Sequence, residues 1–149
     1  MAIRVIRTND DEVLRKKSKN VDAINDRILT LLDDMADTMY KAEGVGLAAP
    51  QIGVLRRLIV IDIGEGMLKL INPQIISYTG EQIDIEGCLS LPDTHGEVKR
   101  PESLIVRAMN DKGQNIEINA SGLLARALNH EIDHLNGILF IDKAIRIVE

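Results

Sequence analysis

The stretch His130-Glu131-Ile132-Asp133-His134, near the end of the 149-residue chain, has the pattern H-E-x-x-H. Residues four apart lie on the same face of an α-helix, so two imidazoles at this spacing can bind one cation. Glu131 lies about 100° further round such a helix, where its carboxylate can reach a water molecule on the cation without being a ligand. The pattern is typical of metal-dependent hydrolases in which the glutamate is the general base.

The residues around this pattern predict the helix that it requires. Residues 123–128 consist mostly of strong helix formers. Ser121 or Asn119 can cap the start of the helix, and Asn136-Gly137 suits its end. A five-residue pattern can arise by chance on a charged helix face, but two of the three histidines in the chain fall in this one. We therefore expect a metal-binding helix.

Two histidines need a third ligand, because catalytic zinc and iron sites usually have three from the protein. One large class of metallopeptidases has a histidine six residues after the second one, but that position is Phe140 here. The only downstream glutamate is Glu149, the last residue, and chain ends are usually poorly ordered. The upstream candidates are Cys88 and His95. We expect His95 to be a surface residue in a polar loop over residues 93–96.

Cys88 is the only cysteine, so it cannot form a disulfide within the chain. A lone cysteine is most often a small buried hydrophobe. Here Gly87 permits a backbone turn and Pro92 stiffens the exit from the segment. A thiolate in a constrained turn suits a divalent metal, so Cys88 is the stronger candidate for the third ligand.

A third segment, residues 44–53, is rich in glycine and alanine. It is a poor match to a phosphate-binding loop, because it lacks the G-K-[S/T] ending and the G-x-G-x-x-G spacing. Small residues at this density let the backbone approach another group closely. Gln51 offers a neutral amide that could stabilise a developing oxyanion, although a merely exposed glutamine in a tight loop is the alternative.

Taken together, the three segments resemble the peptide deformylase family. That family has the motifs G-x-G-x-A-A-x-Q, E-G-C-L-S and H-E-x-D-H in this order, and here they are residues 44–51, 86–90 and 130–134. The similarity extends to residues 11–15, 100–102 and 137–142. One departure is Asn129, where the family usually has glutamine; this position is not a ligand.

The resemblance implies removal of the N-formyl group from newly made polypeptides that begin with formyl-methionine, with release of formate. The implied metal ligands are Cys88, His130 and His134. Glu131 is the implied general base, which then passes its proton to the leaving amine. The side-chain amide of Gln51 and the backbone N–H of Leu89 are the implied oxyanion donors.

The resemblance also suggests ferrous iron as the native metal, with zinc, nickel or cobalt able to replace it. Oxidation of the iron or of Cys88 should then inactivate the enzyme. Some longer relatives extend a C-terminal helix that docks on the ribosome. This chain stops fifteen residues after His134, so we do not expect that mode of docking, although transient contact with the ribosome stays open.

Composition predicts one catalytic domain over residues 1–149. No apolar run approaches the ~20 residues needed to cross a bilayer, and no signal peptide is visible, so we expect a cytoplasmic protein without a membrane partner. The net charge of −5 and the aromatic content of 2% argue against direct binding of nucleic acid. We interpret the basic pairs Lys16-Lys17 and Arg56-Arg57 as solvated surface.

The predicted fold class is α+β, with antiparallel β-sheets packed around the central metal-binding helix. An N-terminal amphipathic helix is expected over residues ~22–42, because apolar residues recur there at the helical spacing. Gly44 is expected to end it. The expected strands are residues 58–63, 68–72 and 74–85, followed by a β-hairpin formed by residues 104–109 and 115–119.

Formyl-methionine needs an apolar slot, for which neighbours of the motifs are candidates: Leu47, Ile85, Leu123 and Leu128. Ordinary core positions are the alternative, above all for Ile85 and Leu128. The peptide backbone could pair with extended segments at Val45–Gly46 and Gly87, as a strand added to a sheet edge. Two other functions are weighed: a peptidase that cuts internal bonds, which leaves two motifs unexplained, and a non-catalytic binder, which Glu131 and Gln51 argue against.

Overall fold

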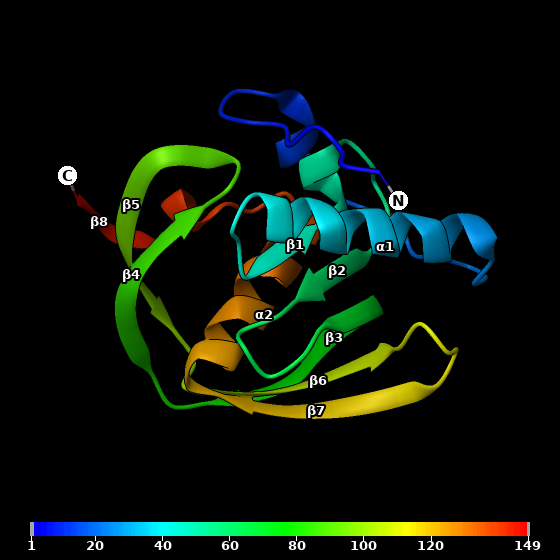
Figure 1. Cartoon of the computed structure of the whole chain (residues 1–149). Coiled ribbons are helices and arrows are strands. Elements are labelled where there is room, and N and C mark those ends of the chain that lie inside the picture. Colours follow the sequence, from blue (N-terminus) through cyan, green and yellow to red (C-terminus); the bar gives the residue numbers. More distant parts are fainter. Residues whose placement is uncertain (1, 149) are drawn as a thin grey trace.

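The helix predicted from the H-E-x-x-H pattern is α2 (Gly122–Leu135), and it lies between two antiparallel sheets (Figure 1). The computed structural model describes residues 2–148. Every residue of α2 from Ala125 to Leu135 is buried. The predicted α+β class, with antiparallel sheets around a central helix, is therefore confirmed.

The larger sheet has five strands in the order β1-β2-β3-β6-β7. Their bounds are β1 Gly46–Ala48, β2 Leu58–Ile61, β3 Leu68–Thr79, β6 Ser103–Met109 and β7 Asn115–Ser121. All four residues of β2 are buried, because both faces of the sheet are covered there. Ile59 and Ile61 pack in the cluster that contains the apolar residues of α2. Leu58 and Val60 pack in the cluster that contains those of α1.

The helix expected over residues 22–42 is α1, and it is shorter, from Asp26 to Lys41. Its start is set by Asn25, whose side chain accepts a hydrogen bond from the N–H of Ile28 at 3.0 Å. Gly44 does not itself take the left-handed conformation that ends the helix. Glu43 does so, at φ +60°, and the N–H of Gly44 then donates to the carbonyl of Met39.

The smaller sheet has the order β4-β5-β8, with β4 Gln82–Cys88, β5 Leu91–Arg100 and β8 Ala144–Val148. Two expectations fail in this region. Residues 68–72 and 74–85 are not two strands: β3 continues through Pro73 by way of irregular pairing, and a turn at Gly80 separates it from β4. His95 lies within β5 and not in a loop, although its side chain is exposed.

The N-terminal segment crosses the loops that carry two of the three motifs. The N–H of Arg7 donates to the carbonyl of Gln51 at 2.7 Å, and the N–H of Asn9 donates to that of Ser90 at 2.8 Å. These bonds fix the two loops relative to one another. Within residues 2–148, neither helix combines the length and apolar character needed to span a bilayer.

Leu128 and Leu123 provide a test of how α2 is buried. Leu128 has no exposed surface, whereas Leu123 is 55% exposed. We expect Leu128→Ala to lower the free energy of unfolding by about 2–5 kcal/mol, because a cavity forms in the core. Leu123→Ala is the matched control and should change it by less than about 0.5 kcal/mol. Urea denaturation measures both, and equal losses would contradict this packing.

Candidate active site

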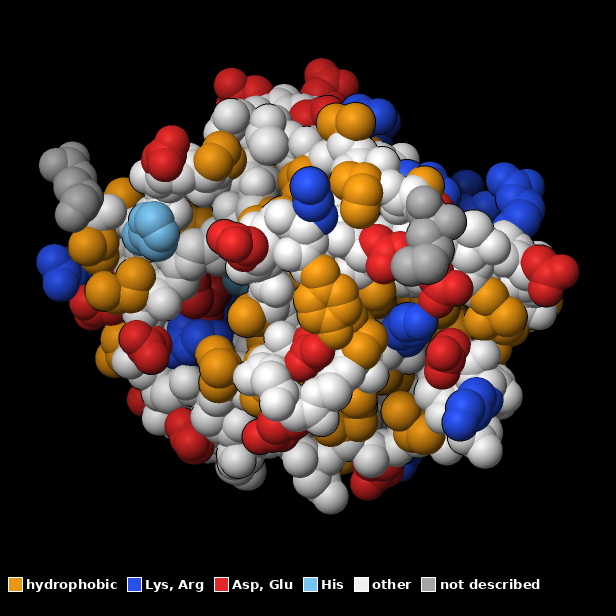
Figure 2. All heavy atoms as spheres, viewed as in Figure 1, with side chains coloured by type: hydrophobic (Ala, Val, Ile, Leu, Met, Phe, Trp, Pro, Cys, Tyr) orange, Lys and Arg blue, Asp and Glu red, His pale blue; other side chains and the backbone are white. Residues whose placement is uncertain are grey.

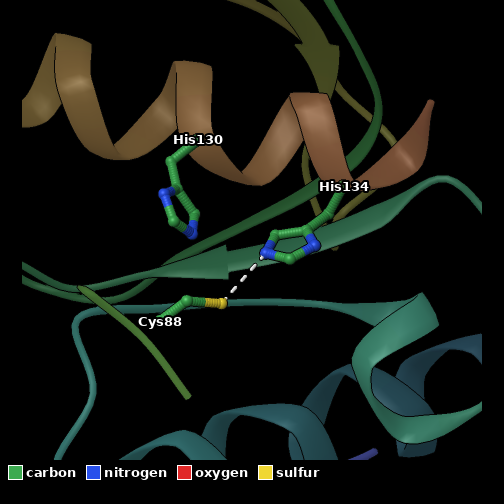
Figure 3. A group of neighbouring side chains, drawn as sticks. All are labelled: Cys88, His130 and His134. Atoms are coloured by element: carbon green, nitrogen blue, oxygen red, sulfur yellow. Dashed lines mark hydrogen bonds between the residues drawn. The ribbon is translucent and has the colours of Figure 1, made fainter. Parts of the chain in front are cut away.

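Three side chains with metal-binding atoms converge where the end of β4 meets α2 (Figure 3). One ligand atom each from Cys88, His130 and His134 lies within 4.8 Å of the other two. The sulfur of Cys88 is 3.3 Å from Nε2 of His134. Ligands at about 2.0–2.3 Å from one tetrahedral ion are about 3–4 Å apart, so the sulfur and this nitrogen fit a shared cation. His95 is not a member of the group.

The orientation of His130 is set by a buried carboxylate that our sequence analysis did not assign. Nδ1 of His130 lies 2.9 Å from Oε1 of Glu86, which leaves Nε2 as the free ring nitrogen. A carboxylate behind a metal-binding histidine fixes its tautomer and makes it a better ligand. Glu86 lies two residues before Cys88 on β4. Alternate residues of a strand share one face, so a strand predicted through Cys88 would have placed Glu86 on the same face as the cysteine.

Glu86 is held in turn by two buried arginines, Arg100 and Arg126. Arg100 donates to both of its oxygens, at 2.6 and 2.8 Å, and Arg126 donates to Oε2. Burial by itself would raise the pKa of Glu86, but the hydrogen bonds from Arg100 and His130 outweigh it and hold that pKa well below its usual range. Glu86 is therefore a carboxylate throughout the neutral range.

The same network includes Asn129, the position where the chain departs from the family motif. The side-chain oxygen of Asn129 accepts a hydrogen bond from Arg100, and Arg100 also donates to Asp133 at 2.9 Å. Lys143 pairs with the same oxygen of Asp133, Oδ2, at 2.8 Å. The side chain of Asn129 thus contacts the network that holds Glu86, and not the metal-binding side chains themselves.

The imidazoles of His130 and His134 are edge to face, with ring centroids 5.0 Å apart. Burial would lower the pKa of His130, but Glu131 and Cys88 raise it to about 10. Burial and the neighbouring His130 lower the pKa of His134. Because the two pKa values move in opposite directions, the pair carries one positive charge and not two in the absence of a metal, and a divalent cation can replace that charge.

Glu131 is buried, and its Oε1 has no hydrogen-bond partner among residues 2–148. Burial raises its pKa to about 7, although the charge of His130 acts in the opposite direction. Gly46 of β1 packs against this carboxylate: a Cβ at position 46 would lie 2.6 Å from Oε2. The glycine at this position therefore gives the carboxylate the room it occupies.

Gln51 lies in a short 3₁₀ helix, Ala49–Ile52, directly after β1. Its Oε1 accepts from the N–H of Ala48 at 2.9 Å, which fixes the amide so that the donor end points towards the cysteine loop. Nε2 then donates to Oγ of Ser90 at 3.1 Å and lies 3.6 Å from the sulfur of Cys88. A neutral donor is thus held beside the cluster of metal-binding atoms.

A cavity of about 390 Å³ opens onto these groups. It is lined by nearly all of the residues that the sequence singled out, including Val45, Gly46, Gln51, Gly87, Cys88, Leu89, Leu123, His130 and Glu131. Ile85 also lines it and is 53% exposed, so it is not a core residue. Leu47 and Leu128 have no exposed surface and do not line the cavity, so the alternative of an ordinary core position holds for both.

Comparison with known proteins agrees with this geometry. A family model described as polypeptide deformylase matches residues 3–148. The peptide deformylase of Alkaliphilus metalliredigens is 65% identical over 146 residues, which cover 98% of this chain and 99% of that protein. The one from Acetivibrio thermocellus is 62% identical over 149 residues, covering 100% and 88%.

Solved structures give the same result for the fold. The peptide deformylase of Thermotoga maritima matches with a TM-score of 0.95 at 38% identity, over 98% of this chain and 100% of that one. The one from Synechococcus elongatus, in complex with actinonin, matches with a TM-score of 0.93 at 42% identity, over 96% and 79%.

Replacement of Glu86 tests its place behind His130. Glu86→Gln should weaken metal binding roughly 10- to 100-fold, because His130 loses the carboxylate that orients it. It should also lower the free energy of unfolding by about 3–5 kcal/mol, because Arg126 loses its only carboxylate partner among residues 2–148 and Arg100 keeps only Asp133. Metal titration followed by elemental analysis measures the first effect, and urea denaturation the second.

Glu97→Gln is the matched control, since Glu97 forms an exposed pair with Arg146 on β5 and β8. We expect it to leave metal affinity unchanged. If the two variants bound metal equally well, Glu86 would have no role in orienting the ligand.

Proposed function

This chain belongs to the polypeptide deformylase family, and on that premise we propose how its residues act. It is a metal-dependent hydrolase that removes the N-formyl group from formyl-methionine at the start of newly made polypeptides and releases formate. The observation that carries the assignment of residues is the convergence of Cys88, His130 and His134 beside a buried Glu131. The 390 Å³ cavity gives a substrate access to Glu131.

Cys88, His130 and His134 would hold the metal. One thiolate and two neutral imidazoles leave a net charge of about +1 on a divalent ion, and this mixed set suits several transition metals. Ferrous iron is the native metal that we propose, with zinc, nickel or cobalt able to take its place. When bound, such an ion supplies Lewis acidity, which lowers the pKa of water and polarises a carbonyl group.

Glu131 is the general base and then the general acid. Its unpaired Oε1 can accept a proton from the attacking water and afterwards give it to the nitrogen of the leaving amine. Without a metal, burial raises the pKa of this carboxyl group to about 7. The charge of a bound cation would favour the carboxylate form from which the cycle starts.

Gln51 and Leu89 form the oxyanion site. The amide of Gln51 is oriented before substrate arrives, because Ala48 and Ser90 hold its two ends. Leu89 lies in the two-residue turn that joins β4 to β5, directly after Cys88. We assign the backbone N–H of Leu89 as the second donor. Donors that need no reorientation at the moment of reaction stabilise the developing charge most effectively.

The peptide binds as an added strand. Among residues 2–148, β1 pairs only with β2 and β4 only with β5, so each presents a free edge. Val45 and Gly46 on one side and Gly87 on the other line the cavity between these edges. Leu123 and Ile85, both exposed at the cavity, provide apolar surface for the methionine side chain.

We further propose that residues 1–149 act as one catalytic domain in the cytoplasm. The chemistry of the substrate supports this location, because a newly made polypeptide carries its formyl group where it is synthesised. Contact with the ribosome would be transient.

Release of formate is the direct test of the function. Protein purified without oxygen and loaded with ferrous iron should release formate from formyl-Met-Ala-Ser and leave the N-acetylated analogue and internal peptide bonds uncut. Exposure to peroxide should abolish this activity by oxidising the metal or the thiol. Cleavage of an internal bond would favour the peptidase alternative, and absence of formate would favour a binding protein.

Two variants separate the base from the ligands in this assay. Glu131→Gln should keep its metal and lose nearly all turnover, because the group that moves the proton is gone. Cys88→Ser should lose metal affinity and turnover together. If Glu131→Gln lost its metal as well, Glu131 would be a ligand and not the base.

Replacement of Gln51 tests the oxyanion site. Gln51→Ala should lower kcat by about 10²–10³-fold, because one donor to the tetrahedral intermediate is missing, and should change KM much less. Leu123→Ala provides the contrast, since loss of apolar contact should mainly raise KM. Steady-state kinetics on a formylated tripeptide measures both. The reverse pattern for Gln51→Ala would remove it from the oxyanion site.

A further inference from the structure

Among residues 2–148, six cations from residues 16–27 and 56–57 have no ion-pair partner. Most Lys and Arg side chains of residues 2–148 pair with a carboxylate. Those that do not are Lys16, Lys17, Lys19, Arg27, Arg56 and Arg57, together with Lys41 and Lys112. We call the first six the basic surface.

The fold brings the two parts of the basic surface together. Residues 19 and 56 form a parallel bridge, in which the N–H of Lys19 donates to Leu55 and the N–H of Arg57 donates to Lys19. The two basic pairs that are 40 positions apart in the sequence are therefore neighbours in space. Figure 2 shows Lys and Arg side chains gathered at the edge of the molecule near the start of α1.

Two hollows flank the segment that carries Lys17 and Lys19, with volumes of about 460 and 950 Å³. Both are lined by Asn20. Lys17 and Arg57 line the first, and the second is lined by Lys19, Arg27 and Arg56. The only carboxylate that lines either hollow is that of Asp22. A concave surface of this charge is complementary to a polyanion.

One member of the basic surface also has a structural role. Nη1 of Arg57 donates to the carbonyl of Leu135 at 3.1 Å, at the end of α2, where a positive charge is favourable. The other five side chains are exposed. Their repulsion is a cost that a partner of opposite charge would remove.

We propose that the basic surface binds the phosphate backbone of RNA. A lipid surface fits less well, because none of the large exposed apolar side chains of residues 2–148 lines either hollow. The lining has no aromatic side chain on which bases could stack, so recognition is by phosphate and independent of sequence. The net charge of the chain led us to expect no direct binding of nucleic acid. A net charge does not report a local concentration of cations, and the proposal therefore departs from that expectation.

The proposal rests on the proposed function, because an enzyme that acts on newly made polypeptides works beside the particle that makes them, and that particle consists largely of RNA. None of the residues of the basic surface lines the catalytic cavity. Binding at the basic surface would therefore leave the cavity free for substrate.

Fluorescence anisotropy of a labelled, mixed-sequence single-stranded RNA tests the proposal with the metal-loaded protein. If about four phosphates are neutralised, affinity should fall about 50-fold between about 50 and about 200 mM salt. Poly(U) and poly(A) should bind within about twofold of one another, because no stacking platform distinguishes them.

Charge-removing variants locate the binding. Lys19→Gln/Arg56→Gln should reduce the same salt effect to about 7-fold, as expected when two of four phosphate contacts are lost. Lys17→Gln/Arg27→Gln should behave alike. Lys41→Gln/Lys99→Gln removes the same charge outside both hollows and should bind as the parent does. All three should release formate from a formylated tripeptide at the parent rate, which shows that they are folded.

Equal RNA binding by all three variants would overturn the proposal, and so would binding to vesicles of anionic phospholipid with none to RNA. Failure of the parent protein to release formate would instead overturn the proposed function, because that assay contains no RNA.

Discussion

The structure of the site depends on one buried carboxylate, Glu86, which is shared by two arginines and a histidine. Arg100 lies on β5 and Arg126 on α2, so their hydrogen bonds to Glu86 tie the smaller sheet to the central helix. The fourth contact, to His130, transmits that position to the cluster of metal-binding atoms. Burying any one of these charges alone would cost free energy, and the arrangement is stable because each charge is paired with one of opposite sign. A disturbance of this support therefore reaches His130 through its hydrogen bond to Glu86, and reaches α2 through the bonds of Arg100 to Asn129 and Asp133.

The parts of the structure that could be predicted from the sequence are those fixed by local pattern. α2 and its two histidines follow from spacing and helix propensity, and the β6–β7 hairpin follows from alternating apolar residues around a turn. The end of α1 shows the limit of such rules. We predicted that Gly44 ends the helix, but it is Glu43 that takes the left-handed backbone conformation there. The following Gly44 is small because Leu89 lies against it, where a Cβ would be 2.7 Å from that side chain.

What could not be predicted depends on contacts between distant segments. Arg100 and Arg126 look like ordinary surface cations in the sequence, and only the pairing of β4 with β5 brings Arg100 to Glu86. His95 sits among Asp93, Thr94 and Gly96, a composition typical of a loop, yet it pairs in register with β8. The basic surface is likewise invisible in the net charge. It exists because residues 16–19 and 56–57 are brought side by side.

The two free sheet edges beside the cavity have a consequence for the range of polypeptides that can be processed. A hydrogen-bonding edge recognises features that every polypeptide shares, and side chains beyond the first residue alternate away from it. In the binding mode that we propose, an apolar wall formed by Ile85 and Leu123 selects only for a methionine-like first residue. Selectivity is thus confined to the one position that all of these chains have in common. A single small catalyst can therefore serve proteins that are otherwise unrelated in sequence.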